Sequence, residues 1–414
     1  MSAKNPTPSI EYSLLLTATL CLLAFGVVMV FSASSTTSLL GDSGDGAYYL
    51  KRTALFGVLG LVMMKVLIGR GVKLVRPLTG AILAGSFLLC LVVLIPGVGV
   101  EVNGAKRWIG AGFIQVQPSE VMKVALILYG AQLLASRPQL TRSVRTMIPY
   151  LAVVAAACLL VVIEPDLGTA MVACFATAAM LVAAGARIRD LGLIAAAIGA
   201  LILLAILIEP YRMERLTGFI NPGADPSGVG FQSIQAKIAL GSGGIFGVGL
   251  GESLQKAFYL PEAHTDMIAA VIGEELGMVG IAGLVGLYGL FGYAGLQIAK
   301  GARDRYGKLL AAGLTSLVLV QAIINLFAVL GLAPLTGVPL PFVSYGNSSM
   351  LVLLASVGLL LNIARGGSVG SAARPSSAGG RLRVVDGSAK GRNSRGRDRG
   401  ARRAGARRSG RAAR

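Results

Sequence analysis

The stretch LGLIAAAIGALILLAILI, residues 191–208, contains only apolar residues and glycines and carries no charged side chain. A helix of this length spans about 27 Å at 1.5 Å per residue, close to the ~30 Å hydrocarbon core of a bilayer. A helix that is apolar on all sides is typical of a membrane span. The stretch therefore predicts a helix that crosses a membrane.

Further segments of similar length and apolar character occur on both sides of this stretch. They predict an all-α polytopic membrane protein with about ten transmembrane helices, at residues 12–33, 53–69, 78–96, 118–135, 147–163, 168–186, 191–208, 267–299, 308–332 and 347–364. The composition agrees, because 54% of the 414 residues are hydrophobic and only 14% are charged. A soluble globular protein, with about a quarter of its residues charged, is excluded.

The predicted spans divide the chain into three parts. Residues 1–11 form a short N-terminal segment, residues 12–364 form the membrane domain, and residues 365–414 form a C-terminal tail. Two long loops interrupt the membrane domain, one at residues 97–117 and a larger one at residues 209–266. Long loops in compact proteins commonly carry function, so we expect the functional residues there.

The distribution of Lys and Arg between the loops predicts the orientation of the chain. If the N-terminus is cytoplasmic, the inner loops carry thirteen basic and three acidic residues, and the outer loops carry eight basic and eleven acidic residues. Basic residues are enriched in cytoplasmic loops of membrane proteins. We therefore expect both termini in the cytoplasm and both long loops outside.

Most of the formal net charge of +19 lies in the tail. Residues 365–414 contain fifteen Lys or Arg and two Asp, in Gly-Arg and Ala-Arg repeats that predict disorder. We expect this tail to bind anionic lipids of the inner leaflet, or alternatively an acidic cytoplasmic partner. It lacks the aromatic residues on which bases stack, so we expect no nucleic-acid binding.

The four cysteines are expected to act as small apolar packing residues. Cys21, Cys90, Cys158 and Cys174 are widely spaced inside apolar segments, without a CxxC pair. This spacing favours neither a disulfide framework nor a zinc site. The sequence also shows no metal-ligand cluster, no nucleophile–base pair and no P-loop.

A few ionisable residues fall within or beside the apolar segments, where a charge is costly unless it is paired or hydrated. Glu120 and Lys123 lie one turn apart at the start of the fourth span, either as a local ion pair or as a pair that faces a polar cavity. Asp266 precedes the eighth span, either as a helix-capping carboxylate or as a functional group. Glu274 and Glu275 are adjacent and cannot share one helix face, so one of them should pair with a neighbouring span.

Several longer motifs then occur in a fixed order along the chain. They are GVVMVFSAS (26–34), AKRWIGAGFIQVQPSEVMK (105–123), EPDLGTAMV (164–172), YRMERLTGFINP (211–222), GFQSIQ through HTDMIAAVIGEELG (230–277) and PLTGVPLPFVSYGNSS (334–349). Through these motifs the chain resembles the SEDS family of polytopic cell-wall proteins, and most closely its cell-division branch.

The resemblance implies a peptidoglycan glycosyltransferase that polymerises lipid II into glycan strands at the outer face of the bacterial cytoplasmic membrane, during septal cell-wall synthesis and division. It implies that Asp266 is the catalytic base. It also implies that Glu120 and Lys123 line the same cavity. The candidates for contacts to the pyrophosphate or the sugars are Arg107, Trp108, Arg212, Arg215, Gln235, Lys237 and His264.

The chemistry of lipid II polymerisation fits one carboxylate at the outer interface. The acceptor 4-hydroxyl attacks the anomeric carbon and expels undecaprenyl pyrophosphate, so a base suffices where a glycosidase needs an acid as well. Basic groups would stabilise the leaving pyrophosphate, and a divalent cation, Mg²⁺ or Mn²⁺, is compatible with that role. A helix N-terminus and Lys123 would both lower the pKa of Asp266 and so make it a weak base. Desolvation would raise this pKa.

The resemblance further implies a class B penicillin-binding transpeptidase as partner, together with other divisome proteins at the septum. Two other functions fit ten spans with buried ions. One is a lipid II flippase or transporter, and the other is a non-catalytic scaffold of the division machinery.

Overall fold

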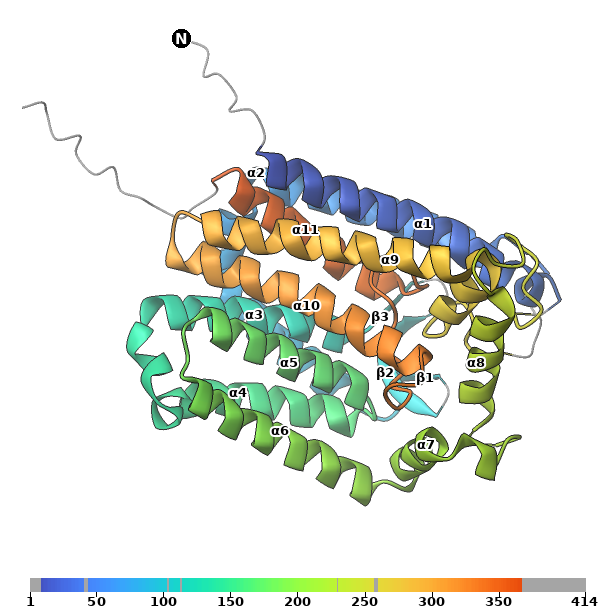
Figure 1. Cartoon of the computed structure of the whole chain (residues 1–414). Coiled ribbons are helices and arrows are strands. Elements are labelled where there is room, and N and C mark those ends of the chain that lie inside the picture. The colour runs from blue at the N-terminus through green and yellow to red at the C-terminus, as the bar shows by residue number, and fades with distance from the viewer. Residues whose placement is uncertain are drawn as a thin grey trace, which may run out of the picture. The chain divides into compact units, whose positions relative to one another are not determined.

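The computed structural model describes residues 9–40, 44–102, 104–111, 114–228, 230–256 and 260–366 (Figure 1). The helices are α1 (Ile10–Leu40), α2 (Tyr48–Val93), α3 (Pro118–Ser136), α4 (Val144–Ile163), α5 (Leu167–Ala183), α6 (Ile188–Ile208), α7 (Pro210–Ile220), α8 (Phe231–Gly243), α9 (Ile268–Gly301), α10 (Arg305–Val329) and α11 (Asn347–Ala364). The strands are β1 (Gly99–Val102), β2 (Ala105–Ala111) and β3 (Ile114–Val116). The predictions for the basic tail beyond residue 366 lie outside the described residues.

The long helices pack side by side in one bundle (Figure 1). The strands, α7 and α8 lie at one end of this bundle, which we call the sheet end, and α1 begins at the opposite end. The prediction of an all-α polytopic membrane protein is confirmed. Seven helices of the described residues, namely α1, α2, α4, α6, α9, α10 and α11, are long and apolar enough to cross a membrane.

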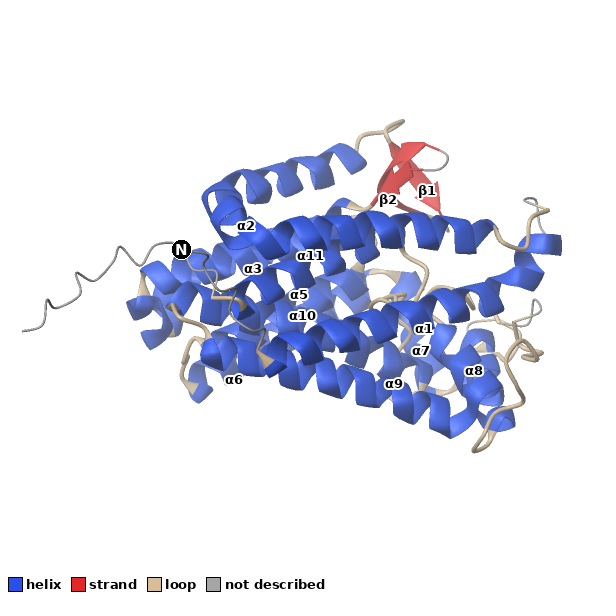
Figure 2. Ribbon diagram, turned by 90° about the horizontal axis from the view of Figure 1, so that it is seen from above, coloured by secondary structure: helices blue, strands red, loops and turns tan. Residues whose placement is uncertain are grey.

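Helix α2 contains two of the predicted spans, the second and the third. Figure 2 shows that it reverses direction, so that its second arm returns toward the strands. The contacts agree, because Arg76 stacks on Tyr306 at the start of α10, whereas the Ser86 hydroxyl lies 3.3 Å from the Met122 sulfur near the start of α3. Pro77 lies inside the helix, between the two predicted spans, where it removes a backbone hydrogen bond and favours a bend.

The described part of the chain therefore has about ten crossing segments. Counting α2 twice and adding α3 and the shorter α5 to the seven long apolar helices gives this number. Several boundaries differ from prediction by a few residues, and α1 is longer at both ends than the predicted span 12–33. Boundaries move because hydropathy marks the apolar part of a helix and not its caps.

Helices α10 and α11 form the centre of the bundle, and α6 lies at its periphery. Of the most apolar eighteen residues of each helix, 67% are buried in α10 and 72% in α11, but only 6% in α6. Small residues allow close packing in the centre, as where Gly295 of α9 meets the Thr315 side chain of α10. The outward side chains of α6 are therefore left for lipid.

Both long loops contain secondary structure that the sequence analysis did not predict. The loop at 97–117 forms an antiparallel sheet in the order β1, β2, β3, in which Ile109 of β2 pairs with Gly99 and with Val116. The loop at 209–266 contains α7 and α8. The sheet and these short helices position the loop side chains beside the bundle.

Helix α9 is interrupted, which corrects the prediction of one continuous span at 267–299. Gly277 has φ 65° and ψ −160°, outside the helical region. The loop after α8 fills the break, because the amides of Val248 and Gly249 donate to the carbonyls of Glu274 and Glu275 at 2.9 and 3.0 Å. In return the amides of Met278 and Val279 donate to the carbonyls of residues 244 and 245. These four hydrogen bonds give partners to backbone donors and acceptors that the interruption of the helix would otherwise leave unpaired.

The two adjacent glutamates beside the break have separate partners. The Glu275 carboxylate pairs with Lys256 at 2.8 Å and accepts a hydrogen bond from Ser32 of α1. This confirms the expectation that one glutamate pairs with a neighbouring span. The Glu274 carboxylate accepts hydrogen bonds from the Ser253 hydroxyl and from the Leu254 amide.

We expect Gly277→Ala to lower the thermal stability of the protein. A Cβ atom at this residue would clash with the backbone of Gly247 and Ile245, and a side chain at positive φ adds about 1–3 kcal/mol of strain. The apparent melting temperature in detergent, measured by fluorescence-detected size exclusion, should fall by several degrees. Gly283→Ala, on the same helix, is the matched control. A Cβ atom at this residue would meet no neighbouring group within 4 Å. Equal melting temperatures of the two variants would contradict the interpretation of the break.

Candidate functional site

Asp266 lies in the turn that precedes α9, at the sheet end of the bundle. The helix begins at Ile268 with Met267 at the N-cap and without a side-chain cap, so the capping alternative for Asp266 is wrong. Its carboxylate is half-buried and lies 3.4 Å from the Thr265 hydroxyl. Because it caps no helix, this carboxylate is available for chemistry.

Two amide side chains of α10 hold the backbone around Asp266. The Asn325 amide donates to the Asp266 carbonyl at 2.7 Å and to the Val338 carbonyl at 2.8 Å. One turn earlier, the Gln321 amide donates to the Pro339 carbonyl at 3.0 Å. The turn before α9 and the loop before α11 are thus fastened to the same helix.

Gly337 separates Asp266 from a guanidinium group. A Cβ atom at this position would lie 3.9 Å from both Asp266 Oδ2 and Arg215 Nη1, and the backbone has φ 71°. Arg215 reaches this place from α7, where it stacks on Tyr211 and donates to the Leu335 carbonyl at 3.1 Å. The glycine therefore keeps open the space that the carboxylate and the guanidinium share.

The surroundings of Asp266 raise its pKa to about 6. Burial is the largest cause, and the negative charge of Glu262 adds to it, whereas Arg215 acts in the opposite direction. The expectation that Lys123 would hold this pKa down is not met, because Lys123 pairs elsewhere. A carboxylate with this pKa is still mostly ionised at pH 7 but is a stronger base than an ordinary aspartate.

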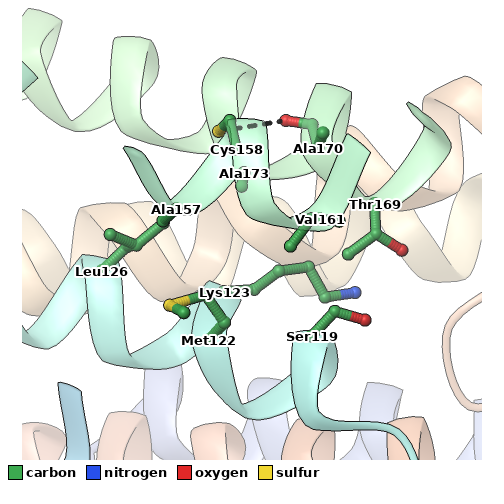
Figure 3. Close-up of a pocket in the computed structure, with 10 residues that line it drawn as sticks. All are labelled: Ser119, Met122, Lys123, Leu126, Ala157, Cys158, Val161, Thr169, Ala170 and Ala173. Atoms are coloured by element: carbon green, nitrogen blue, oxygen red, sulfur yellow. Dashed lines mark hydrogen bonds between the residues drawn. The ribbon is translucent and has the colours of Figure 1, made fainter. Parts of the chain in front are cut away.

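Glu120 and Lys123 form a buried ion pair. Helix α10 connects this pair to the backbone around Asp266. Lys123 Nζ donates to the Glu120 carboxylate at 2.9 Å and to the side-chain oxygen Oε1 of Gln321 at 3.0 Å, and both charged side chains are 2% exposed. Figure 3 shows Lys123 in a narrow crevice among α3, α4 and α5, which Ser119 and Met122 also line. The pair therefore links α3 to the amide of α10 that holds Pro339 and does not contact Asp266.

A larger cavity, of about 520 Å³, opens among α5, α6, α7 and α10. Its walls are mainly apolar, with Phe175, Ile206 and Phe327 among them. Its lining also includes three arginines, Arg107, Arg212 and Arg215.

Backbone carbonyls hold these arginines in place. Arg107 of β2 donates to the Glu164 and Pro165 carbonyls. Arg212 donates to the Val162 and Ala205 carbonyls, at 2.9 Å each. Carbonyl partners fix a guanidinium group without neutralising its charge, so the three cations remain suited to an anion.

The remaining predicted residues are spread around this region. Trp108 is half-buried on β2 beside Arg107, and Gln235 is half-buried on α8. Lys237 of α8 lies against Gly331, close to the end of α10. The His264 ring packs on Tyr49 with ring centres 4.3 Å apart, and burial lowers its pKa, which favours the neutral form. His264 therefore holds the turn against α2.

Several residues of the site were missed by the sequence analysis. Gln321 and Asn325 occur four residues apart in an apolar segment, a polar spacing that could have been recognised. Gly337 gives no comparable signal. Asp166 caps α5 through the Thr169 amide and accepts a hydrogen bond from Gln117, while burial raises the pKa of Glu164 to about 7. Among the described residues, no group of three or more His, Cys, Asp or Glu side chains could hold a metal ion.

The fold and this site define a polytopic α-helical membrane protein with a carboxylate and three arginines beside an apolar cavity. The family model of cell cycle proteins named for FtsW, RodA and SpoVE matches residues 12–368, so the chain belongs to this family.

Individual relatives agree over most of the chain. Stage V sporulation protein E of Bacillus subtilis is 41% identical, over 88% of this chain and 99% of its own length. A probable peptidoglycan glycosyltransferase FtsW of Trichlorobacter lovleyi is 41% identical, over 88% of this chain and 96% of its own. A chain from the solved structure of a peptidoglycan synthase complex that coordinates polymerization and crosslinking is also similar. It has a TM-score of 0.70 and 29% sequence identity, and the likeness covers 85% of this chain and 96% of that chain.

We expect Lys123→Met to destabilise the protein strongly, because it leaves Glu120 buried without its cation. Removal of one partner of a buried ion pair costs about 3–5 kcal/mol. The double variant Lys123→Met with Glu120→Gln should recover most of this loss in melting experiments in detergent. Lys51→Met is the control, because its pair with Asp45 is largely exposed and is expected to contribute about 0–1 kcal/mol. A double variant no more stable than the single one would contradict the pairing.

Proposed function

We propose that the protein is a peptidoglycan glycosyltransferase that polymerises lipid II at the outer face of the cytoplasmic membrane during septal wall synthesis, with Asp266 as the catalytic base. The observation that carries the proposal is the open space at Gly337, which the Asp266 carboxylate and the Arg215 guanidinium share. Arg215 also lines the apolar cavity, so the base and the cavity adjoin one another.

The cavity has the two properties that a lipid-linked diphosphate needs. Apolar walls among α5, α6, α7 and α10 suit an isoprenoid chain. Arg107, Arg212 and Arg215 offer forked donors that match phosphate oxygens. The Trichlorobacter lovleyi relative, a probable peptidoglycan glycosyltransferase, supports this choice of substrate.

The reaction then needs few groups from the protein. The acceptor 4-hydroxyl attacks the anomeric carbon of the lipid-linked chain, and its proton passes to the Asp266 carboxylate. The bond from that carbon to the pyrophosphate oxygen breaks, and its electron pair leaves with undecaprenyl pyrophosphate. The arginines stabilise the charge that develops on the leaving group. The raised pKa of Asp266 makes it a better proton acceptor than an ordinary aspartate would be.

The proposal places the sheet end outside the cell and both termini in the cytoplasm. The excess of basic residues in the opposite loops supports this orientation. A class B penicillin-binding transpeptidase is the proposed partner, supported by the likeness to a chain from a peptidoglycan synthase complex.

The central test is polymerisation of lipid II in detergent by the full chain together with its cognate transpeptidase. Asp266→Asn keeps the shape of the side chain and removes its basicity, and we expect glycan products to fall at least a hundredfold. Glu214→Gln, an exposed residue of α7, is the matched control.

Related measurements separate the other two functions. A flippase would form no polymer in detergent but would move lipid II across the membrane of liposomes. A scaffold would support cell division equally well with Asp266→Asn. Polymerisation by Asp266→Asn at the rate of the unmodified protein would overturn the role of this residue.

The pH dependence should report the same carboxylate. Activity at saturating lipid II should fall as the pH drops through about 6, because protonated Asp266 cannot accept the proton. Glu262→Gln removes a negative charge that raises this pKa, so the acidic limb should shift to lower pH. Arg215→Gln removes a positive charge that lowers it, so the limb should shift to higher pH. Shifts in the same direction for both variants would contradict the assignment.

A further inference from the structure

The segment 244–254, between α8 and the turn before α9, presents a row of exposed apolar side chains. Phe246 is 81% exposed and Leu254 is 75% exposed, and Ile245, Val248 and Leu250 are also exposed. Apolar groups gathered in this way on one short loop mark a surface that contacts something other than water. The proposed reaction uses none of these residues.

This exposure does not come from a loosely held chain. Four backbone hydrogen bonds join residues 244–249 to the interrupted part of α9. The later part is held from inside, because Glu274 accepts from the Leu254 amide and buried Lys256 donates to the Gly251 carbonyl at 2.7 Å. These backbone groups of the segment thus face inward, and its apolar side chains face outward.

The segment continues the apolar outer surface of the bundle. Met278 and Val279 of α9, which bond to it directly, are 68% and 56% exposed. On α1, Ser32 bonds to Glu275 and Thr37 bonds to the Lys256 carbonyl, so this helix lies alongside. Phe31 of α1 is exposed as well. The surface formed by α1 and α9 faces acyl chains, and the segment extends it at the sheet end.

The charge of the segment limits both its depth and its partner. Glu252 is the single charged residue in 244–254, and it is exposed. A carboxylate avoids hydrocarbon, so the segment can enter only the boundary between headgroups and acyl chains. It offers no exposed cation to anionic headgroups, so apolar contact must supply the binding.

We propose that residues 244–254 form an interfacial anchor, with Phe246 at its tip, that inserts into the acyl-chain boundary of the leaflet at the sheet end. The anchor follows α8 directly, and α8 carries Lys237 against Gly331 beside the site. Insertion therefore holds α8 at a fixed height relative to the membrane. This role is independent of the proposed reaction.

Depth-dependent fluorescence quenching tests the anchor. The chain has one tryptophan, Trp108, so Phe246→Trp in a Trp108→Phe background gives a single probe. The full chain is reconstituted in phosphatidylcholine vesicles that contain lipids brominated either near the headgroup or near the end of the acyl chain. We expect blue-shifted emission, with stronger quenching by bromine near the headgroup. Replacing part of the lipid with phosphatidylglycerol, or adding salt, should not change the quenching.

Three further probes make the result decisive. Leu254→Trp provides a second position should the first variant fold poorly. Val285→Trp, on the exposed side of α9, should be quenched more by the deeper bromine, and Asp225→Trp, on the exposed loop after α7, should show no quenching. Red-shifted, unquenched emission at 246 and 254 would overturn the anchor. Blue-shifted emission without quenching would overturn it too, because a protein contact with a second copy would then cover the segment.

Discussion

Buried polar groups need hydrogen-bond partners, and this constraint shapes the break in α9 and the placement of charges inside the bundle. Where α9 is interrupted at Gly277, a loop from outside the helix supplies the missing donors and acceptors. Two ion pairs lie inside the bundle, Lys123 with Glu120 and Lys256 with Glu275, and the Glu274 carboxylate accepts hydrogen bonds instead. The backbone groups named at the break and these charged side chains thus have bonding partners within the protein.

The same constraint builds the site. A carbonyl released where a chain turns back toward the bundle needs a donor, and Gln321 and Asn325 supply donors from the central helix. These bonds leave the Asp266 side chain unconstrained while they fix its backbone. The arginines of the site donate to backbone carbonyls, which gives these carbonyls their donors. The guanidinium groups are thereby oriented and keep their charge.

Much of the fold could be predicted from apolar runs, because membrane spans are long and their signal adds over many residues. The run at 191–208 is recovered as α6, and the two runs that α2 combines are still two crossings. The break at Gly277 was not predictable, because one glycine in an apolar run is common and the partner that fills the break lies about thirty residues away in sequence.

Part of the site could also be predicted. The sequence singled out Asp266, Arg107, Arg212 and Arg215, and these residues lie in one region. The bond from Asn325 to Asp266 was not foreseen, because it depends on tertiary contact.

The bond between Ser32 and Glu275 spans 243 positions of the chain, whereas Lys256 and Glu275 are only 19 apart. At a synthesis rate of about 5–20 residues per second, Ser32 waits roughly 10–50 s for this partner, and Lys256 waits only about 1–4 s. A lone hydroxyl tolerates lipid at small cost, but a lone ammonium or carboxylate does not. The order of residues along the chain therefore lets the two expensive charges meet almost as soon as they are made, while the inexpensive group is the one that waits in the nascent membrane.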